Sequence, residues 1–157
     1  MIEIERKFLV KSNDFKSLAT SKVFIQQGYL SKDPHRTVRI RIKDKQAFLT
    51  IKGISNASGM SRFEWEKEIT LEEGKTLIRL CLPTIIEKTR FIVPQGKLSF
   101  EVDIFKGNHK GLIIAEVELK NEKKSIDLPH WVGKEVTGNK RYYNSYLSSS
   151  KESKNSL

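Results

Sequence analysis

The sequence is poor in the residues that build disulfide scaffolds and zinc modules. It contains a single cysteine, Cys81, and three histidines that are scattered without metal-site spacing. One cysteine excludes an internal disulfide and a zinc knuckle. Because Leu80 and Leu82 flank Cys81, we expect a buried and unreactive thiol.

Long apolar runs are also missing. No stretch of apolar residues is long enough to span a bilayer. The first residues carry acids where a secretory signal peptide has a basic region, so we expect no signal peptide. With the lone cysteine, these features predict a cytoplasmic protein without a membrane partner. The sequence also lacks a P-loop, a catalytic cysteine and a Ser/His/Asp set, so none of these competes as the source of activity.

What the sequence has in excess is charge. Charged residues make up 31% of its 157 residues, and 29 Lys and Arg against 19 Asp and Glu leave a net charge of +10. The length suits one domain with a core of its own. A basic excess indicates either a polyanionic partner, such as nucleic acid, anionic lipid or a phosphorylated small molecule, or simply a basic surface.

The first ten residues alternate between apolar and charged side chains. In a strand, residues two apart share a face. Glu3, Glu5 and Lys7 therefore lie on one face of the predicted strand, and Ile2 and Ile4 on the other. The charged face presents two carboxylates followed by an ammonium group.

Seven later segments also have the character of strands, in their period-two alternation and their β-branched and aromatic residues. With the first segment they make eight strands, most of them joined as antiparallel neighbours, and eight strands suit a small closed barrel. The seven segments are residues 23–30, 37–43, 47–52, 62–69, 85–93, 98–105 and 112–120.

Three helices are predicted between and after these strands. They cover residues 15–19, residues 71–81 behind a capping-box pattern, and residues 139–147. We therefore expect a mainly β protein of the α+β type, with a single domain over residues 1–147. Residues 148–157 are polar and rich in Ser, which predicts a disordered tail.

The charged faces of several strands are of one sign. On a face that points to solvent, two like charges that are two residues apart make no favourable interaction with each other, and such faces usually carry charges of both signs. Two architectures fit: an ordinary barrel with its charges in water, or an inverted barrel whose charges line a lumen. In the inverted form, basic strands would surround a polyphosphate and acidic strands would hold divalent metal ions. The pattern favours the inverted barrel but leaves both open. The same-sign pairs are Arg39/Arg41, Lys88/Arg90 and Glu116/Glu118.

A series of short motifs along the chain points to one family. The motifs are Glu3-Ile4-Glu5-Arg6-Lys7, Arg39-Ile40-Arg41, Thr50-Ile51-Lys52, Lys88-Thr89-Arg90, Glu101-Val102-Asp103, Glu116-Val117-Glu118 and Arg141-Tyr142-Tyr143-Asn144. The first is an ExExK pattern, and the others follow in the same order and at similar spacing as in that family. Over residues 1–147 the chain resembles the CYTH superfamily, the triphosphate tunnel metalloenzymes, and within it the short bacterial inorganic triphosphatases.

The resemblance implies an eight-stranded antiparallel tunnel with a polar lumen, a few helices packed outside and a C-terminal helix. It also implies hydrolysis of a triphosphate with Mg²⁺ or Mn²⁺ as cofactor. Lys7 and Tyr29 would form the catalytic pair. The phosphate-binding residues would be Lys7, Arg39, Arg41, Lys52, Lys88 and Arg90. The metal-binding or water-orienting residues would be Glu3, Glu5, Glu116 and Glu118, with Glu66, Glu68 and Asp103 as further candidates.

Members of this family differ in substrate. We expect inorganic tripolyphosphate, because the short chain has no obvious extra segment that would recognise a base or thiamine. A thiamine triphosphatase and a class IV-type adenylyl cyclase are the alternatives within the family, although the His-Phe variant of the first strand that marks bacterial cyclases is absent. The alternative from another class is a polyphosphate- or nucleic-acid-binding module without catalysis. Acidic strands between the basic ones argue against nucleic acid as a partner. The outer apolar face allows for a homodimer.

Overall fold

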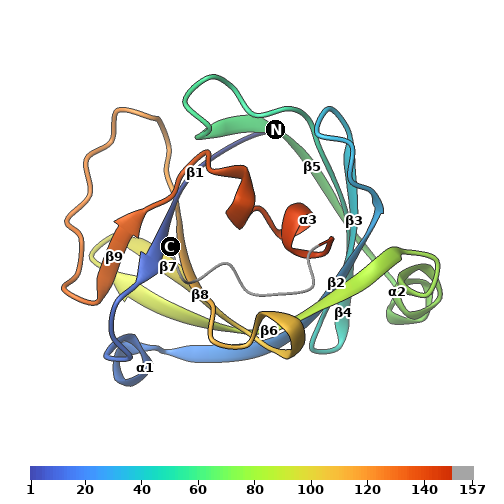
Figure 1. The fold of residues 1–157 in the computed structure, drawn as a ribbon, viewed down its shortest axis with the longest axis horizontal. Coiled ribbons are helices and arrows are strands. Elements are labelled where there is room, and N and C mark those ends of the chain that lie inside the picture. The colour runs from blue at the N-terminus through green and yellow to red at the C-terminus, as the bar shows by residue number, and fades with distance from the viewer. Residues whose placement is uncertain (150–157) are drawn as a thin grey trace.

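The protein folds into a closed antiparallel barrel, as predicted. The computed structural model describes residues 1–149. In these residues nine strands form one sheet, in the order β5-β4-β3-β2-β6-β7-β8-β1-β9, and β1 also pairs with β5. Eight strands therefore close the ring and β9 lies outside it (Figure 1). The strands are β1 (Ile2–Val10), β2 (Ser21–Ser31), β3 (Thr37–Lys43), β4 (Gln46–Lys52), β5 (Ser61–Ile69), β6 (Leu82–Gln95), β7 (Leu98–Phe105), β8 (Ile113–Glu118) and β9 (Val132–Glu135).

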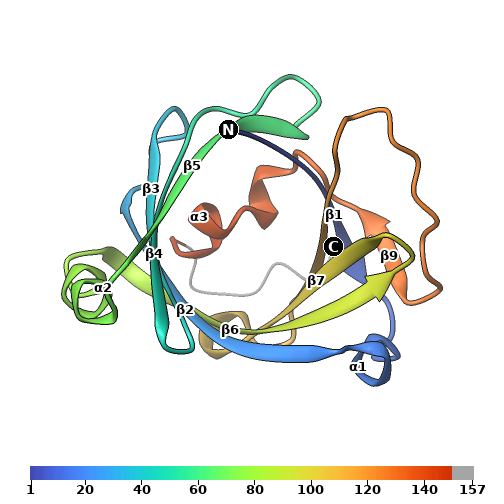
Figure 2. The same ribbon diagram turned by 180° about the vertical axis from the view of Figure 1, so that it is seen from behind.

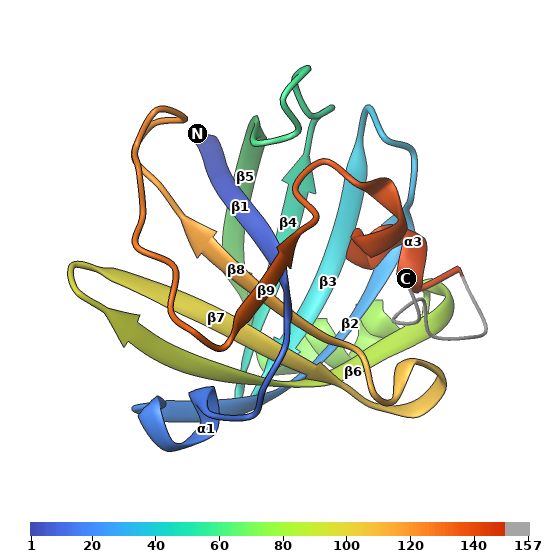
Figure 3. The ribbon, with the colours of Figure 1, turned by 60° about the vertical axis from the view of Figure 1, so that its left-hand side comes forward.

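The first strand closes the barrel because it is shared by three neighbours. β8 pairs with residues 5–9 of β1 along one edge. Along the opposite edge, β5 pairs with residues 2–4 and β9 pairs at Phe8 and Val10 (Figure 3). Residues 132–135 were not among the predicted strands. They form a strand because the free edge of β1 offers unpaired N–H and C=O groups.

The predicted helices are confirmed in place but not in length. They are α1 (Phe15–Leu18), α2 (Leu71–Ile78) and α3 (Asn144–Leu147), with 3₁₀ turns η1 (Gly107–His109) and η2 (Lys140–Tyr142). The capping box at α2 is confirmed, since Glu73 N donates to Thr70 Oγ1 and Thr70 N donates to Glu73 Oε1. The continuous helix predicted over residues 139–147 is wrong. Tyr143 is extended (φ −71°, ψ 136°), so η2 and α3 are separate turns.

The helices differ in the side of the barrel wall on which they lie. α1 and α2 lie outside the ring of strands, whereas α3 lies within it (Figures 1 and 2). α1 adds Phe15 to an outer apolar cluster around Phe8, Phe100 and Trp131. α2 approaches β4 so closely that a Cβ added at Gly74 would come within 2.4 Å of the Cβ of Ala47. The apolar faces of the strands therefore point outward, as the inverted architecture requires.

Two further expectations concern the thiol and the tail. Cys81 is only partly buried, although burial raises the pKa of its thiol. Ser148 is buried, and its carbonyl oxygen accepts a hydrogen bond from Thr84 N at 2.7 Å. The folded part of the chain therefore extends at least one residue beyond the predicted end at residue 147. Residues 150–157 lie outside the described residues, and the domain boundary and the disordered tail stay predictions. Within residues 1–149, every helix is too short or too polar to traverse a membrane.

Candidate active site in the barrel lumen

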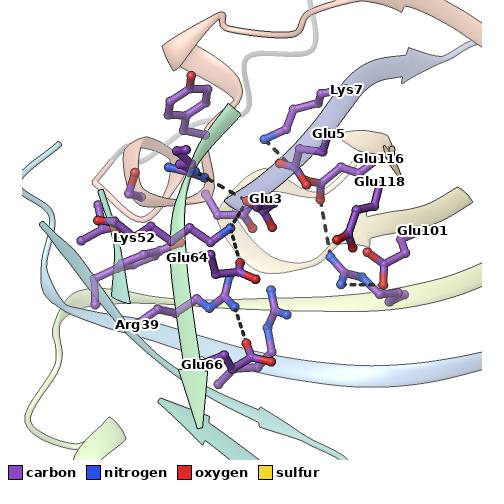
Figure 4. Close-up of a pocket in the computed structure, with 18 of the residues that line it drawn as sticks. Glu3, Glu5, Lys7, Arg39, Lys52, Glu64, Glu66, Glu101, Glu116 and Glu118 are labelled. Carbon is purple, nitrogen blue, oxygen red and sulfur yellow. Dashed lines mark hydrogen bonds and ion pairs between the residues drawn. The ribbon is translucent and has the colours of Figure 1, made fainter. Parts of the chain in front are cut away.

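The lumen contains a cavity of about 210 Å³ with almost entirely polar walls (Figure 4). All eight strands of the ring contribute to these walls or to the groups directly behind them. Eleven of the predicted site residues line the cavity: Glu3, Glu5, Lys7, Tyr29, Arg39, Arg41, Lys52, Glu66, Arg90, Glu116 and Glu118. Lys88 and Asp103 are fully buried beside Arg90, while Glu68 is exposed and does not line the cavity.

The strand register explains why these side chains meet. Within each strand, alternate residues face the lumen. Across strands, the pairing sets Lys7 opposite Glu116 and Glu5 opposite Glu118. Directly opposed residues lie within contact distance of each other. β1 and β8 therefore present three carboxylates and one ammonium group as a compact patch.

One half of the lumen is organised around Arg90. Its guanidinium donates two hydrogen bonds to Asp103, at 2.7 and 2.8 Å, and lies 3.2 Å from Glu101 Oε2 and 3.5 Å from Glu116 Oε1. Lys88 Nζ is 2.8 Å from Asp103 Oδ2. Burial raises the pKa of Asp103, but Arg90 and Lys88 outweigh burial and bring that pKa down to about 2. Asp103 is therefore an ionised counter-ion that holds two cations together.

The opposite wall repeats this arrangement with Lys52. Its Nζ lies 2.8 Å from Glu3 Oε1 and 3.2 Å from Glu64 Oε2, and Arg62 Nε lies 3.6 Å from the same Glu3 oxygen. Burial raises the pKa of Glu3, but the charge of Lys52 and the hydrogen bonds around the carboxylate lower that pKa to about 2. Glu3 is consequently ionised and already paired.

Two arginines on β3 are less well matched by acids. Arg41 has no carboxylate within ion-pair distance in residues 1–149, and its Nε donates to Gln27 Oε1 at 2.9 Å. Burial, followed by the charges of Arg39 and Arg90, lowers the pKa of Arg41 to about 9. Arg39 contacts Glu66 at 3.4 Å, yet its buried Nε has no hydrogen-bond partner among the described residues. A buried donor without a partner is unfavourable, so an anion that binds at the β3 side of the cavity would gain a hydrogen bond there.

Around Glu5 the situation is reversed, because several carboxylates lie together with too few cations to balance them. Burial, then the charges of Glu116 and Glu3, raises the pKa of Glu5 to about 8. The pKa of Glu118 is also raised, by burial and by Glu3. No group of three or more acidic, histidine or cysteine side chains within residues 1–149 is arranged as a complete metal site. Mg²⁺ is commonly held by one or two carboxylates together with substrate phosphates and water, and the excess negative charge at Glu5 fits such a shared site.

The predicted catalytic pair lies in the cavity without direct contact. Lys7 Nζ donates to the carbonyl oxygen of Tyr142 at 3.2 Å and lies 3.9 Å from Glu116 Oε2. Tyr29 lines the same cavity from β2, opposite Arg39 in the strand register. Within the described residues, no hydrogen bond or ring contact joins Lys7 to Tyr29. A ligand between them is needed if both are to act on one reacting group.

Several lining residues were not among the predicted site residues. Arg62, Glu64 and Glu101 line the cavity, and their period-two spacing from predicted residues was a signal that could have identified them. Tyr143 and Asn144 also line it, but they come from the C-terminal segment that folds into the ring. No sequence periodicity could have placed them there.

Comparisons with known proteins agree with this architecture. The CYTH domain family matches residues 1–153. A relative from Acetivibrio thermocellus, named inorganic triphosphatase, is 42% identical over 146 residues, which is 92% of each chain. One of the same name from Nitrosomonas europaea is 36% identical over 153 residues, or 94% of this chain and 97% of the relative. The crystal structure of the inorganic triphosphatase NE1496 superposes with a TM-score of 0.68 and 32% identity, over 96% of this chain and 99% of that one. The chain therefore belongs to the CYTH family.

Proposed function

We propose that this protein is an inorganic triphosphatase, a metal-dependent hydrolase that cleaves a phosphoanhydride bond of tripolyphosphate by water attack inside the lumen. The observation that carries the proposal is the pair of arginines on β3, which are less well matched by acids than the other cations of the lumen. Arg39 and Arg41 are neighbouring cations in the lumen cavity; among residues 1–149, Arg39 Nε has no hydrogen-bond partner and the Arg41 guanidinium has no carboxylate within ion-pair distance. The relatives named inorganic triphosphatase support the same activity.

The proposed phosphate-binding cations surround the cavity from several strands. Phosphoryl transfer depends mainly on positioning and on stabilisation of charge, for which such a shell is suited. Arginine forks bind phosphate through two donors, whereas lysine acts as a point charge. The proposed set is Lys7, Arg39, Arg41, Lys52, Lys88 and Arg90.

The proposed metal site lies on the acidic side. Mg²⁺ or Mn²⁺ fits carboxylate oxygens and would supply polarisation of the phosphoryl group and a more acidic bound water. Burial, followed by the charges of Glu116 and Glu3, raises the pKa of Glu5, and a bound cation would favour the ionised carboxylate. Glu5 would therefore give up its proton when the ion binds. The proposed metal-binding residues are Glu3, Glu5, Glu116 and Glu118, with Glu66, Glu68 and Asp103 as further candidates.

Lys7 and Tyr29 are proposed as the catalytic pair. Both line the cavity and both are nearly fully buried, with 5% of each exposed. In a water-poor site, an ammonium group and a phenol placed next to the reacting phosphoryl group stabilise charge that develops during cleavage.

A phosphate-release panel tests the activity. Purified protein is assayed with tripolyphosphate, thiamine triphosphate, ATP and pyrophosphate, each with Mg²⁺, Mn²⁺ or EDTA. We expect tripolyphosphate to be hydrolysed fastest and EDTA to abolish turnover. Faster turnover of thiamine triphosphate would favour the thiamine triphosphatase alternative, and formation of cyclic AMP from ATP would favour the cyclase. Activity that persists in EDTA would contradict the metal role.

A binding measurement tests the lumen without catalysis. A ligand at a hundredfold excess over its Kd stabilises the folded state by about 2.7 kcal/mol, on the order of 5–10 °C in Tm for a chain of this size. Tripolyphosphate should produce this shift, and orthophosphate at equal ionic strength should not, because one phosphate cannot reach all the cations. A double Arg39→Ala, Arg41→Ala variant should lose most of the shift. Greater stabilisation by duplex DNA would favour the nucleic-acid-binding alternative.

We further propose a homodimer in the cytoplasm, without a nucleic-acid partner. Ile2 and Phe63 are neighbours in the β1–β5 register, and 65% and 43% of these residues are exposed on the outer face. An apolar patch of this kind is a surface for a second copy. Analytical ultracentrifugation of the wild-type protein and of Phe63→Ser checks the dimer, since a monomeric wild type would contradict it. The lone free thiol, Cys81, suits a reducing compartment.

A further inference from the structure

The C-terminal segment brings three consecutive residues, Tyr142, Tyr143 and Asn144, into contact with cations of the site or with a group that holds one. Between η2 and α3 the chain crosses inside the ring of strands (Figures 1 and 2). Tyr142 ends η2, Tyr143 is extended, and Asn144 begins α3. We name residues 142–144 the cation clamp, because each of them contacts a lysine or arginine of the site or a group that holds one.

The first two clamp residues contact Lys7. The carbonyl oxygen of Tyr142 accepts a hydrogen bond from Lys7 Nζ at 3.2 Å. The ring centroid of Tyr143 lies 5.2 Å from Lys7 Nζ and 5.4 Å from Arg62 Cζ, so one ring contacts two cations. The hydroxyl group of Tyr143 lies 3.3 Å from Ser55 Oγ, a contact that holds the far end of the ring in place.

The third clamp residue holds two more cations through carboxamides. Asn144 Oδ1 accepts hydrogen bonds from Lys88 Nζ at 2.9 Å and from Gln27 Nε2 at 2.8 Å. Gln27 is fully buried, and its Oε1 accepts from Arg41 Nε at 2.9 Å. A relay of two neutral amides therefore joins Lys88 on β6 to Arg41 on β3.

All these contacts are made by neutral acceptors: a carbonyl, an aromatic face and two carboxamides. A neutral acceptor orders a cation without cancelling its charge, whereas a carboxylate does both. Arg90 illustrates the second case, since three carboxylates lie within 3.5 Å of its guanidinium. Arg41, in contrast, is ordered by Gln27 and keeps its charge available for a phosphate group.

The clamp is itself fixed in place from both sides. After it, Leu147 is fully buried in an apolar cluster with Ile86 and Phe105, and its carbonyl oxygen lies 2.7 Å from His109 Nε2. Before it, Gly138 packs against Gly59 so closely that a Cβ added at Gly59 would come within 2.4 Å of Gly138 Cα. The cations therefore contact a rigid segment.

We propose that Tyr143 and Asn144 are positioning residues that hold Lys7, Lys88 and, through Gln27, Arg41 in the geometry needed for phosphate binding without placing a further negative charge beside them. The proposal rests on the proposed triphosphatase function. It assigns the C-terminal segment a role in ordering the substrate-binding cations as well as in closing the end of the barrel.

An isosteric exchange at Asn144 tests the neutral relay. Lys88 already pairs with Asp103, and Asn144→Asp keeps the shape but places a second carboxylate beside this lysine. We therefore expect the KM for tripolyphosphate to rise about tenfold, the equivalent of one weakened charge-assisted hydrogen bond, with a smaller change in kcat. Asn108→Asp makes the same change in net charge on the exposed turn η1 and should change neither constant. Equal KM values for Asn144→Asp and the wild type would overturn the relay.

A pair of exchanges at Tyr143 tests the aromatic contact. Tyr143→Phe keeps the ring, and Tyr143→Leu removes it. We expect kcat/KM to stay within about twofold for Phe and to fall about fivefold for Leu, as a buried cation–π contact predicts. Equal loss in both variants would overturn the role of the ring.

An NMR measurement on Lys88 tests its contact with Asn144 independently of triphosphatase activity. The ¹⁵N resonance of the Lys88 ammonium group should shift or broaden in Asn144→Asp and stay unchanged in Asn108→Asp. If the wild type neither binds nor hydrolyses tripolyphosphate, the proposed function fails, and this resonance alone then decides the clamp. An unchanged Lys88 resonance in Asn144→Asp would overturn the clamp whatever the activity.

Discussion

The inner face of one group of strands has two ends of opposite character. On β6, β7 and β8, the inward residues are charged over most of the cavity and apolar at the end that the C-terminal segment closes. The apolar end packs against Tyr142 and Leu147. The inward sequence along each strand is Ile86, Lys88 and Arg90 on β6, Phe105, Asp103 and Glu101 on β7, and Ile114, Glu116 and Glu118 on β8.

The two ends contribute differently to the free energy of unfolding. Apolar burial stabilises the fold by about 25 cal/mol for each Å² removed from water. A buried ion pair gains little net stability, because desolvation of both charges offsets their attraction. The apolar end and the outer cluster therefore stabilise the barrel, and the charged end is kept for ligands. Substitutions at the charged end should consequently change catalysis or binding, and substitutions at the apolar end should change the free energy of unfolding.

Lys7→Met should have the largest effect, and it should be on catalysis. We expect kcat with tripolyphosphate to fall by about a thousandfold, or about 4 kcal/mol, since a buried charge that stabilises the transition state is lost. Tyr29→Phe should lower kcat in the same direction. Steady-state kinetics measure both, and Lys11→Met, which removes an exposed lysine, is the matched control. A rise in KM without a fall in kcat would make Lys7 a substrate-binding group only.

Leu147→Ala should break the apolar end. Leu147 is fully buried, so we expect the free energy of unfolding to fall by about 3 kcal/mol, through lost burial and the cavity that remains. Urea denaturation measures the change. Leu18→Ala removes the same atoms from a residue that is 52% exposed and should change stability by less than about 0.5 kcal/mol. Similar losses in the two variants would contradict the assignment of stability to the apolar end.

Glu5 should make metal binding depend on pH. Because its pKa is raised to about 8, the metal-free protein carries a proton on Glu5 at neutral pH. Mg²⁺ must displace this proton, so the apparent affinity should rise about tenfold per pH unit up to about pH 8 and then level off. The metal-free protein should also lose stability as pH rises from about 4.5 to about 8, because only the unfolded chain has released the proton in that range.

Calorimetric titration with Mg²⁺ and thermal unfolding across this pH range measure the two effects of Glu5. Glu5→Gln should reduce the loss of stability between about pH 4.5 and pH 8, leaving the smaller contribution of groups such as Glu118, and should weaken metal binding at high pH. A Mg²⁺ affinity that is equally pH-dependent in Glu5→Gln would show that another group carries the proton.

The smallest effects on kcat/KM are expected at two acids on β5, Glu66 and Glu68, of which only the first lines the cavity. Glu66 accepts hydrogen bonds from Thr50 at 2.6 Å and from Arg39 at 3.4 Å and lines the cavity. Glu66→Gln should lower kcat/KM about threefold, as the loss of an ion pair of this exposure predicts. Glu68 is exposed and contacts Gln46, so Glu68→Gln should stay within about twofold of the wild type. Equal losses would place Glu68 in the site.

Period-two alternation was sufficient to predict much of the barrel. The strands over residues 37–43 and 98–105 have the predicted bounds, and the charged faces lie in the lumen. The same rule could have predicted Arg62, because it lies two residues before Glu64 on β5. β6 was predicted too short, from residue 85 to 93. It runs from Leu82 to Gln95 and includes two prolines, which are usually read as strand ends.

The sequence by itself determined which residues alternate, which strands carry one sign of charge and where the capping box begins α2. These are local properties, set by backbone geometry and by residues a few positions apart. The tertiary structure alone decided that the charged faces point inward, that β9 adds to β1, and that Tyr143 and Asn144 enter the ring. Each of these depends on contacts between segments more than a hundred residues apart, as between Lys7 and Tyr142, and the free energy of such contacts exists only once the barrel has closed.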